Sequence, residues 1–275
     1  MESVISQIYE NWELVVVDNG SGDGTSKYVT DLNHPKIRLV TVQNGGSIAM
    51  SRNLGVSVST GNWVAFLDSD DWWETNKLQV VADSIDSNID FVFHGMLIEG
   101  SSPLYPSLET IPGRKLSKPV FLDLITKGNP IATSSVAIRR ELLNKIGGMN
   151  EDLRMKGVED FNAWLKVSRL TDNFLHLDEI LGTYRVHDSN TSSYSNSVIP
   201  LIAIEEFLHL ITSRQSRKAI ANFEYIVGRL AFLNRDYSIA KKHLLNSLFH
   251  GRWDQRIKSL WMFVSIFLNK LKDYI

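Results

Sequence analysis

The chain has 275 residues, of which 43% are apolar and 22% are charged, as expected of a globular protein with one or two domains. Its formal net charge is −2, so there is no overall basic field to attract nucleic acid. The absence of Cys excludes disulfides, thiolate catalysis and zinc–thiolate sites. The sequence predicts neither a signal peptide nor the roughly 18 consecutive apolar residues of a membrane-spanning helix, and we therefore expect a cytoplasmic protein.

The first hundred residues alternate between candidate strands and candidate helices. Short apolar runs bounded by turn residues predict strands at residues 13–17, 37–42, 63–67 and 90–97. Helical spacing predicts helices at residues 26–32, 48–57 and 75–85, after the end of another helix within residues 1–10. The expected N-caps are Ser47 and either Thr25 or Ser26. This alternation predicts an α/β fold with a mostly parallel, Rossmann-like sheet flanked by helices.

The next hundred residues are also mixed, after a loop at 99–119 that is rich in Pro, Gly and Ser. The pattern predicts helices at residues 121–127, 140–146 and 158–170, and strands at residues 133–138 and 180–186. We expect the helix at 158–170 to bury Phe161, Trp164, Leu165 and Leu170.

The last part of the chain predicts helices alone, at residues 201–211, 219–233, 237–248 and 253–272. We therefore expect an α/β domain over residues 1–198 and an all-helical extension over residues 199–275. The final helix is apolar at 260–264 and 266–268 and carries several basic residues. Peripheral contact of residues 252–275 with the inner face of the cell membrane would suit such a helix. The alternative is packing on the catalytic domain or on a second subunit.

Three carboxylates directly after a predicted buried strand carry the most chemical information. The run from Val64 reads Val-Ala-Phe-Leu-Asp-Ser-Asp-Asp and ends at Asp71. Clustered carboxylates repel one another and are costly to desolvate unless a positive partner joins them. Mg2+ or Mn2+ prefers such oxygen ligands and commonly also holds substrate phosphates. The sequence therefore predicts a metal–phosphate site at the carboxyl end of this strand, where open α/β sheets bind their ligands.

Further polar clusters follow other predicted elements. Asp18 begins a turn-forming run after the first strand, and Glu159-Asp160 lie near the start of a helix. Because the carboxyl ends of parallel strands share one edge, we expect the clusters at Asp18 and at 68–71 to converge. Each cluster also has a simpler interpretation. The run at Asp18 is an ordinary turn if Asx and Gly residues serve only there as turn formers, and the clusters at 68–71 and 159–160 are ordinary acidic residues at the start of a helix if they only favour the helix dipole.

Three blocks occur in a fixed order. They read Val-Val-Asp18-Asn-Gly-Ser-Gly-Asp-Gly-Thr25, then Ser-Arg52-Asn53-Leu-Gly55, and then Thr-Gly61-Asn-Trp-Val-Ala-Phe-Leu-Asp68-Ser-Asp70-Asp71. Their order and spacing resemble the family 2 glycosyltransferases with the GT-A fold, of the bacterial cell-surface polysaccharide type. Later segments at 147–151, 159–160 and 184–187 are similar to the acceptor half of the same family. The resemblance implies a nucleotide-sugar half over 1–98 and an acceptor half over 99–198.

The resemblance also implies site residues. Donor-binding roles are implied for Asp18, Asn19, Ser21, Arg52, Asp68 and Ser69, with Asp18 accepting from the nucleotide base. Asp70 would be a direct ligand of Mg2+ or Mn2+, and His187 resembles a residue that approaches the metal or the diphosphate. Asp160, with Glu159, resembles the general base of the inverting members. For Arg52 and His187 the simpler alternatives are a surface ion pair and an ordinary histidine beside a strand.

The implied reaction is metal-dependent transfer of a sugar from a nucleotide-sugar donor, UDP-linked, to a hydroxyl of a saccharide or lipid-linked acceptor, with inversion. A carboxylate within hydrogen-bond reach of the acceptor hydroxyl would take its proton, a contribution typically worth about 10²–10⁴ in rate. The expected setting is synthesis of a cell-surface polysaccharide or glycolipid. A nucleotidyltransferase is an alternative, although the chain lacks the basic, Gly-rich phosphate loop that such enzymes carry.

The chain departs from the family pattern at its start. Family members usually open with a strand and a helix, whereas Met1 here falls inside the following block, Ser3-Val4-Ile5-Ser6-Gln7. We therefore expect the first strand to be missing, which would leave unpaired backbone groups in the sheet. A second alternative follows, in which the chain is a non-catalytic remnant that acts as a binding protein.

Overall fold

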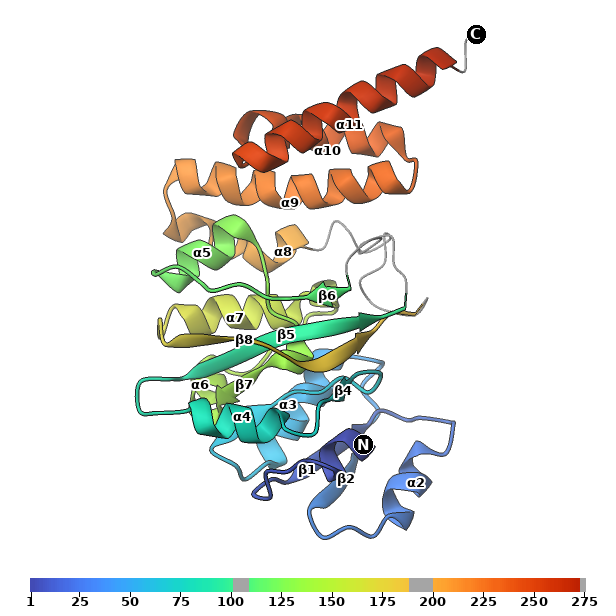
Figure 1. Ribbon diagram of the computed structural model, residues 1–275, viewed down its shortest axis with the longest axis vertical. Coiled ribbons are helices and arrows are strands. Elements are labelled where there is room, and N and C mark those ends of the chain that lie inside the picture. The colour runs from blue at the N-terminus through green and yellow to red at the C-terminus, as the bar shows by residue number, and fades with distance from the viewer. Residues whose placement is uncertain (101–108, 188–199, 273–275) are drawn as a thin grey trace.

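The computed structural model describes residues 1–100, 109–187 and 200–272, which form two sheets and the helices around them (Figure 1). The chain opens with α1 (Glu2–Ile5) and then forms β1 (Leu14–Asp18), α2 (Thr25–Asp31), β2 (Ile37–Thr41) and α3 (Ile48–Val58). β1 and β2 make a parallel two-stranded sheet, with Leu14 opposite Ile37. The predicted alternation of strands and helices is confirmed over this part.

The second sheet has six strands. Its order is β3 (Trp63–Ala65), β7 (Ala137–Arg139), β5 (Phe91–Glu99), β8 (Phe174–Arg185) and β4 (Trp72–Trp73), and β6 (Thr110–Ile111) pairs with β5. β5 and β8 run parallel, and the other pairs are antiparallel. The α/β fold class is as expected, but the prediction of a mostly parallel sheet is wrong for these strands. An apolar run marks a buried strand without encoding its direction.

Helices cover both faces of this sheet. They are α4 (Lys77–Ser84), α5 (Val120–Lys127), α6 (Arg140–Lys145) and α7 (Glu159–Ser168). Figure 1 shows α5 and α7 above the strands and α4 below them. The main core contains Phe91, which contacts Trp164 at 4.9 Å and Phe174 at 4.4 Å between ring centroids. Such offset and edge-to-face pairs add to the stabilisation from burial.

Three local predictions about these elements are corrected. Residues 133–135 form a 3-10 turn, η1 (Thr133–Ser135), instead of a strand, because their hydroxyls bond to other groups, a use that favours turns. α2 is capped by Gly24 at a φ of +88°, and neither Thr25 nor Ser26 caps it. Leu170 is 51% exposed because α7 ends at Ser168. The predicted cap at Ser47 is confirmed by its bond from the Met50 N–H.

After residue 199 the described chain is helical throughout. It forms α8 (Pro200–Glu205), the 3-10 turn η4 (Leu208–Leu210), α9 (Ser213–Leu233), α10 (Tyr237–His250) and α11 (Trp253–Lys272). Ile204, Phe207 and Phe223 pack into the same core as α5 and α7. A separate cluster around Leu244 and Ile266 joins α9, α10 and α11. The division into domains at 198/199 stays a prediction.

None of the described helices is long and apolar enough to cross a membrane.

Candidate active site

Arg52 joins three parts of the chain that are far apart in sequence. Its side chain lies on α3 and donates to the Asp68 carboxylate at 2.6 Å and to the Glu159 carboxylate at 2.8 Å. The Arg52 and Glu159 side chains are 13% and 5% exposed. Burial disfavours the cation, but the charges of Asp68, Glu159 and Asp160 outweigh it and raise the pKa of Arg52. Arg52 is therefore a permanent positive charge between carboxylates from the turn after β3 and from α7.

The turn after β3 is held by a serine from η1. The Ser134 hydroxyl accepts from the Asp68 N–H at 3.0 Å and donates to the Asp71 carboxylate at 2.6 Å. The other Asp71 oxygen accepts from the Arg185 N–H at 3.0 Å. Burial raises the pKa of Asp71 to about 7. Both Asp71 oxygens thus accept hydrogen bonds from within the protein, whereas Asp68 and Asp70 on the same turn are partly exposed.

Asp70 and His187 lie against each other, with 2.7 Å between the carboxylate oxygen and Nε2. Pairing of β4 with β8 places Trp72 opposite Thr183 and so brings the turn after β3 to the end of β8. Both side chains are about one-third exposed. A carboxylate oxygen and an imidazole nitrogen suit Mn2+, and the carboxylate suits Mg2+. The described residues contain no group of three or more His, Asp or Glu that could hold a metal.

Glu159 and Asp160 begin α7 and have different surroundings. Glu159 pairs with Arg52 and also accepts from the Gly157 N–H at 2.6 Å. Asp160 accepts from the Thr133 hydroxyl at 2.6 Å and from the Phe161 N–H at 2.6 Å. Burial and the Glu159 charge raise the pKa of Asp160 to about 6, against the opposing effects of Arg52 and these hydrogen bonds.

Asp18 lies at the carboxyl end of β1 and is 4% exposed. It accepts from the Ser21 N–H at 2.8 Å and from the Ser26 hydroxyl, and these bonds hold the pKa of Asp18 below its usual range. The Asn19 side chain is bonded to Asn44, whose own amide donates to Ser51 at 3.0 Å. Ser51 precedes Arg52, so α3 connects the two parts of the candidate site.

The structure therefore brings together some predicted site residues and leaves others apart. Arg52, Asp68, Glu159 and Asp160 form one connected group. Asp70 and His187 form a second group on the neighbouring turn. Within the described ranges no hydrogen bond joins Asp18 to Asp68 or Asp70, and the link runs through α3. Ser21 and Ser69 are exposed in the turns after β1 and β3.

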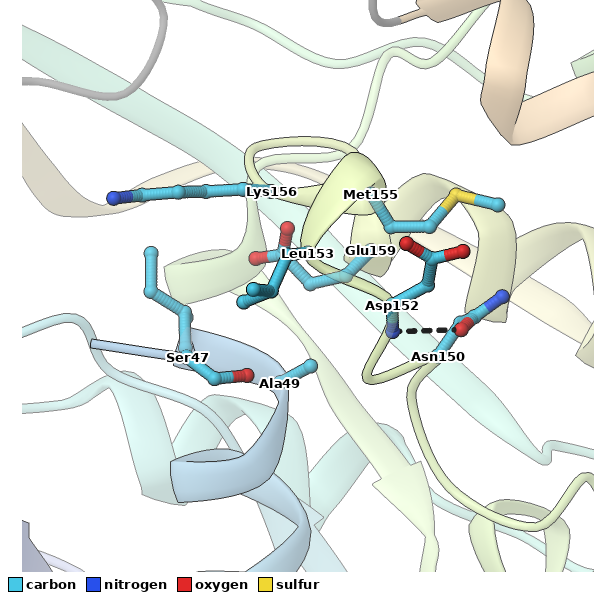
Figure 2. Close-up of a pocket in the computed structure, with 9 residues that line it drawn as sticks. Ser47, Ala49, Asn150, Asp152, Leu153, Met155, Lys156 and Glu159 are labelled. Atoms are coloured by element: carbon cyan, nitrogen blue, oxygen red, sulfur yellow. Dashed lines mark hydrogen bonds between the residues drawn. The ribbon is translucent and has the colours of Figure 1, made fainter. Parts of the chain in front are cut away.

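A small pocket lies beside the Arg52 group. It is lined by the start of α3, by Glu159 and by five residues of the segment before α7: Asn150, Asp152, Leu153, Met155 and Lys156. Figure 2 shows Ser47 and Ala49 on one side, with Lys156 and Glu159 extending from the opposite segment. The pocket therefore separates α3, which lies in the predicted nucleotide-sugar half, from residues of the predicted acceptor half.

Several residues that build the site were not predicted from the sequence. Thr133 and Ser134 each position a carboxylate, and the run Thr-Ser-Ser within apolar surroundings was the available signal. Asn53 binds both the N–H and the C=O of Met149, at 2.8 and 2.9 Å. Gly148 makes this contact possible, because a Cβ there would lie 2.6 Å from the Asn53 oxygen. Asn53 thus docks α3 onto the loop before η2 (Leu153–Met155).

Residues 1–147 match the family model described as glycosyl transferase family 2. The chain belongs to this family. It is 29% identical over 198 residues to the Escherichia coli UDP-Glc:alpha-D-GlcNAc-diphosphoundecaprenol beta-1,3-glucosyltransferase WfgD, a match that covers 70% of this chain and 73% of WfgD. A putative teichuronic acid biosynthesis glycosyltransferase of Bacillus subtilis, TuaG, is 26% identical to this chain. The match covers 70% of this chain and 75% of TuaG.

Solved glycosyltransferases have a similar GT-A-like fold. The structure of Staphylococcus aureus TarS 1–349 in complex with UDP gives a TM-score of 0.54 at 19% identity, covering 90% of this chain and 85% of that one. The structure of the mannosyltransferase PcManGT from Pyrobaculum calidifontis, in complex with GDP-Man and Mn2+, gives a TM-score of 0.53 at 20% identity. The match covers 97% of this chain and 75% of PcManGT. The family match and the curated relatives together show that this chain is a glycosyltransferase of the bacterial polysaccharide type.

The Ser134 contacts give a stability prediction. Ser134→Ala removes a partner from both the Asp68 N–H and the buried Asp71 carboxylate, so we expect the free energy of unfolding to fall by about 1–3 kcal/mol. This free energy is measured by urea unfolding, with circular dichroism as the signal. Ser135→Ala is the matched control, because this equally buried hydroxyl donates only to the Ala132 carbonyl, which the Ser135 N–H also satisfies. Equal losses in the two variants would contradict the role of Ser134.

Proposed function

We propose that this glycosyltransferase moves a sugar from a UDP-linked donor to a hydroxyl of a saccharide or lipid-linked acceptor, with inversion and with Mg2+ or Mn2+. The observation that carries the proposal is the Arg52 group, which ties the aspartate turn after β3 to the carboxylates that begin α7. A relative supports the substrate class, since WfgD is named for transfer from UDP-Glc to a diphosphoundecaprenol-linked acceptor. Synthesis of a cell-surface polysaccharide or glycolipid is the setting that we propose.

The nucleotide would bind along the carboxyl ends of β1 and β3. Asp18 is held ionised by its hydrogen bonds and would accept from the N–H of the uracil ring. Ser21 and Asn19 lie in the following turn and would border the base. Asp68, held by Arg52, would lie nearer the ribose, and Ser69 would follow it on the turn.

Asp70 and His187 would hold the divalent cation beside the donor diphosphate. The cation, when bound, would stabilise the negative charge that develops on the departing nucleoside diphosphate. Arg52 would contribute a fixed positive charge near the same end of the donor, because its ion pairs keep it charged and oriented.

Asp160 would be the general base. Its raised pKa makes the carboxylate a stronger proton acceptor than an ordinary aspartate, and it remains ionised near neutral pH. Glu159 would position Arg52, because its carboxylate is already paired with that cation. The acceptor oxygen would bond to the anomeric carbon as its proton moves to Asp160, and the bond from that carbon to the diphosphate would break. A single displacement of this kind inverts the anomeric configuration.

Asp160→Asn tests the base. We expect transfer to fall by about 10²–10⁴, because the amide cannot take the acceptor proton, while calorimetric binding of UDP with Mn2+ stays unchanged. Asp178→Asn is a control at a carboxylate on β8 that is 97% exposed and pairs with His176. Turnover equal to that of the unsubstituted chain would remove Asp160 from the mechanism. Absence of transfer in the unsubstituted chain itself would favour the alternative of a binding protein.

Asp70→Asn tests the cation site. Loss of a charged ligand should weaken Mn2+-dependent UDP binding by more than about tenfold, given that even supporting groups at metal sites are worth about 10–100-fold. Titration in EDTA is the internal control and should give the same affinity for both proteins. An unchanged Mn2+-dependent affinity would show that the cation binds elsewhere.

The pH dependence of transfer follows from the raised pKa of Asp160. The carboxylate must be unprotonated to act, so kcat should fall as the pH falls through about 6. An aspartate without this environment would lose activity only near about pH 4. Steady-state rates at saturating donor and acceptor, measured across this range with Mn2+ present, provide the test. A rate that holds constant down to pH 5 would contradict the assignment.

A further inference from the structure

The last helix, α11, has a buried face and, opposite it, an exposed apolar face. One face contains Gln255, Ser259, Met262 and Ile266, which are at most 5% exposed and pack toward α9 and α10. These residues are spaced four, three and four apart, as expected of a single helical stripe. A helix that only covered its neighbours would carry polar residues on the other side.

The opposite face of α11 is instead apolar and open to solvent. Its members have exposed fractions between 49% and 75% and recur at helical spacing: Trp253, Ile257, Leu260, Trp261, Val264, Phe267 and Leu268. At 100° per residue, these positions cluster on the side directly away from the buried stripe. Scattered exposed apolar residues need no explanation, but a contiguous patch of this kind marks an interaction surface. We call these seven residues the outer face of α11.

The charge around this surface is positive. Arg256 and Lys258 are exposed on the two flanks of α11, between the outer face and the buried stripe, and Asp254, on the flank of Lys258, is the single acidic residue within Trp253–Lys272. Residues 199–275 contain twelve Lys and Arg against six Asp and Glu, whereas the whole chain has a net charge of −2. Figure 1 shows α11 at the end of the molecule farthest from β1 and β2. The basic charge is thus concentrated in the region that presents the apolar face.

We propose that the outer face of α11 lies in the surface of an anionic lipid bilayer. Its Trp, Phe and Leu side chains enter the boundary between headgroups and acyl chains, and the bordering cations contact the lipid phosphates. The helix lies on the bilayer without crossing it. This surface is separate from the carboxylate site, and it would keep the enzyme at the place where a lipid-linked acceptor is found.

A second copy of the chain fits this surface less well. An isologous contact through α11 would bring two like-charged helices together, with Asp254 alone to offset the cations of each. Asp254 is already bonded to Arg252. Anionic lipid, in contrast, complements both the apolar residues and their charged border.

Vesicle flotation of the full chain tests the proposal, with phosphatidylcholine alone and with phosphatidylcholine–phosphatidylglycerol mixtures. We expect binding to the anionic vesicles and much weaker binding to the neutral ones. The triple variant Trp253→Gln, Leu260→Gln and Phe267→Gln should reduce partitioning by about tenfold or more. Charge reversal by Arg256→Glu and Lys258→Glu should lower binding to the anionic vesicles by a similar factor.

A matched control replaces three exposed apolar residues elsewhere, Ile8→Gln, Leu170→Gln and Ile180→Gln, and should bind vesicles normally. Calorimetry with UDP and Mn2+ on every variant distinguishes a loss of vesicle binding from damage to the catalytic site. The α11 variants should bind UDP as tightly as the unsubstituted chain does. Equal flotation of the α11 and control variants would overturn the proposal. So would an absence of vesicle binding together with a dimer, detected by light scattering, that the α11 triple variant converts to a monomer.

Discussion

The pair of bonds made by Arg52 is the contact on which the arrangement of the site depends. One guanidinium from α3 holds a carboxylate from the turn after β3 and another from the first turn of α7. Glu159 is nearly buried, so removing its partner would leave a charge without compensation, at a cost of about 3–5 kcal/mol. The same contact joins the half of the chain proposed to bind the donor to the half proposed to bind the acceptor.

Two hydroxyl groups position the site carboxylates in addition to the Arg52 ion pairs. Thr133 and Ser134 are neighbours in η1, yet one bonds to Asp160 and the other to the turn that carries Asp68 and Asp71. A short 3-10 turn therefore fixes the two carboxylate groups relative to each other. Each carboxylate oxygen retains further acceptor capacity, because one hydrogen bond uses only one of its lone-pair positions. This is the preorganisation that charge stabilisation and proton transfer require.

The sequence predicted the elements of the first half well, because apolar periodicity and turn residues mark them clearly. It also identified the carboxylates that the structure brings near Arg52. Its prediction of mostly parallel strands was wrong for the six-stranded sheet, and β4 was missed because two tryptophans form no recognisable run. The roles of Ser134 and Asn53 depend on contacts over 60 residues or more in sequence, which no local pattern encodes.

Carboxylates from separate segments of the chain are proposed to surround one nucleoside diphosphate and its cation. A crystal grown with UDP and Mn2+, with anomalous diffraction used to locate the manganese, tests that claim most directly. The account predicts an anomalous peak in contact with Asp70 and with the diphosphate, and the uracil ring at Asp18. Manganese bound away from the turn after β3, or a nucleotide that does not approach Asp18, would contradict it.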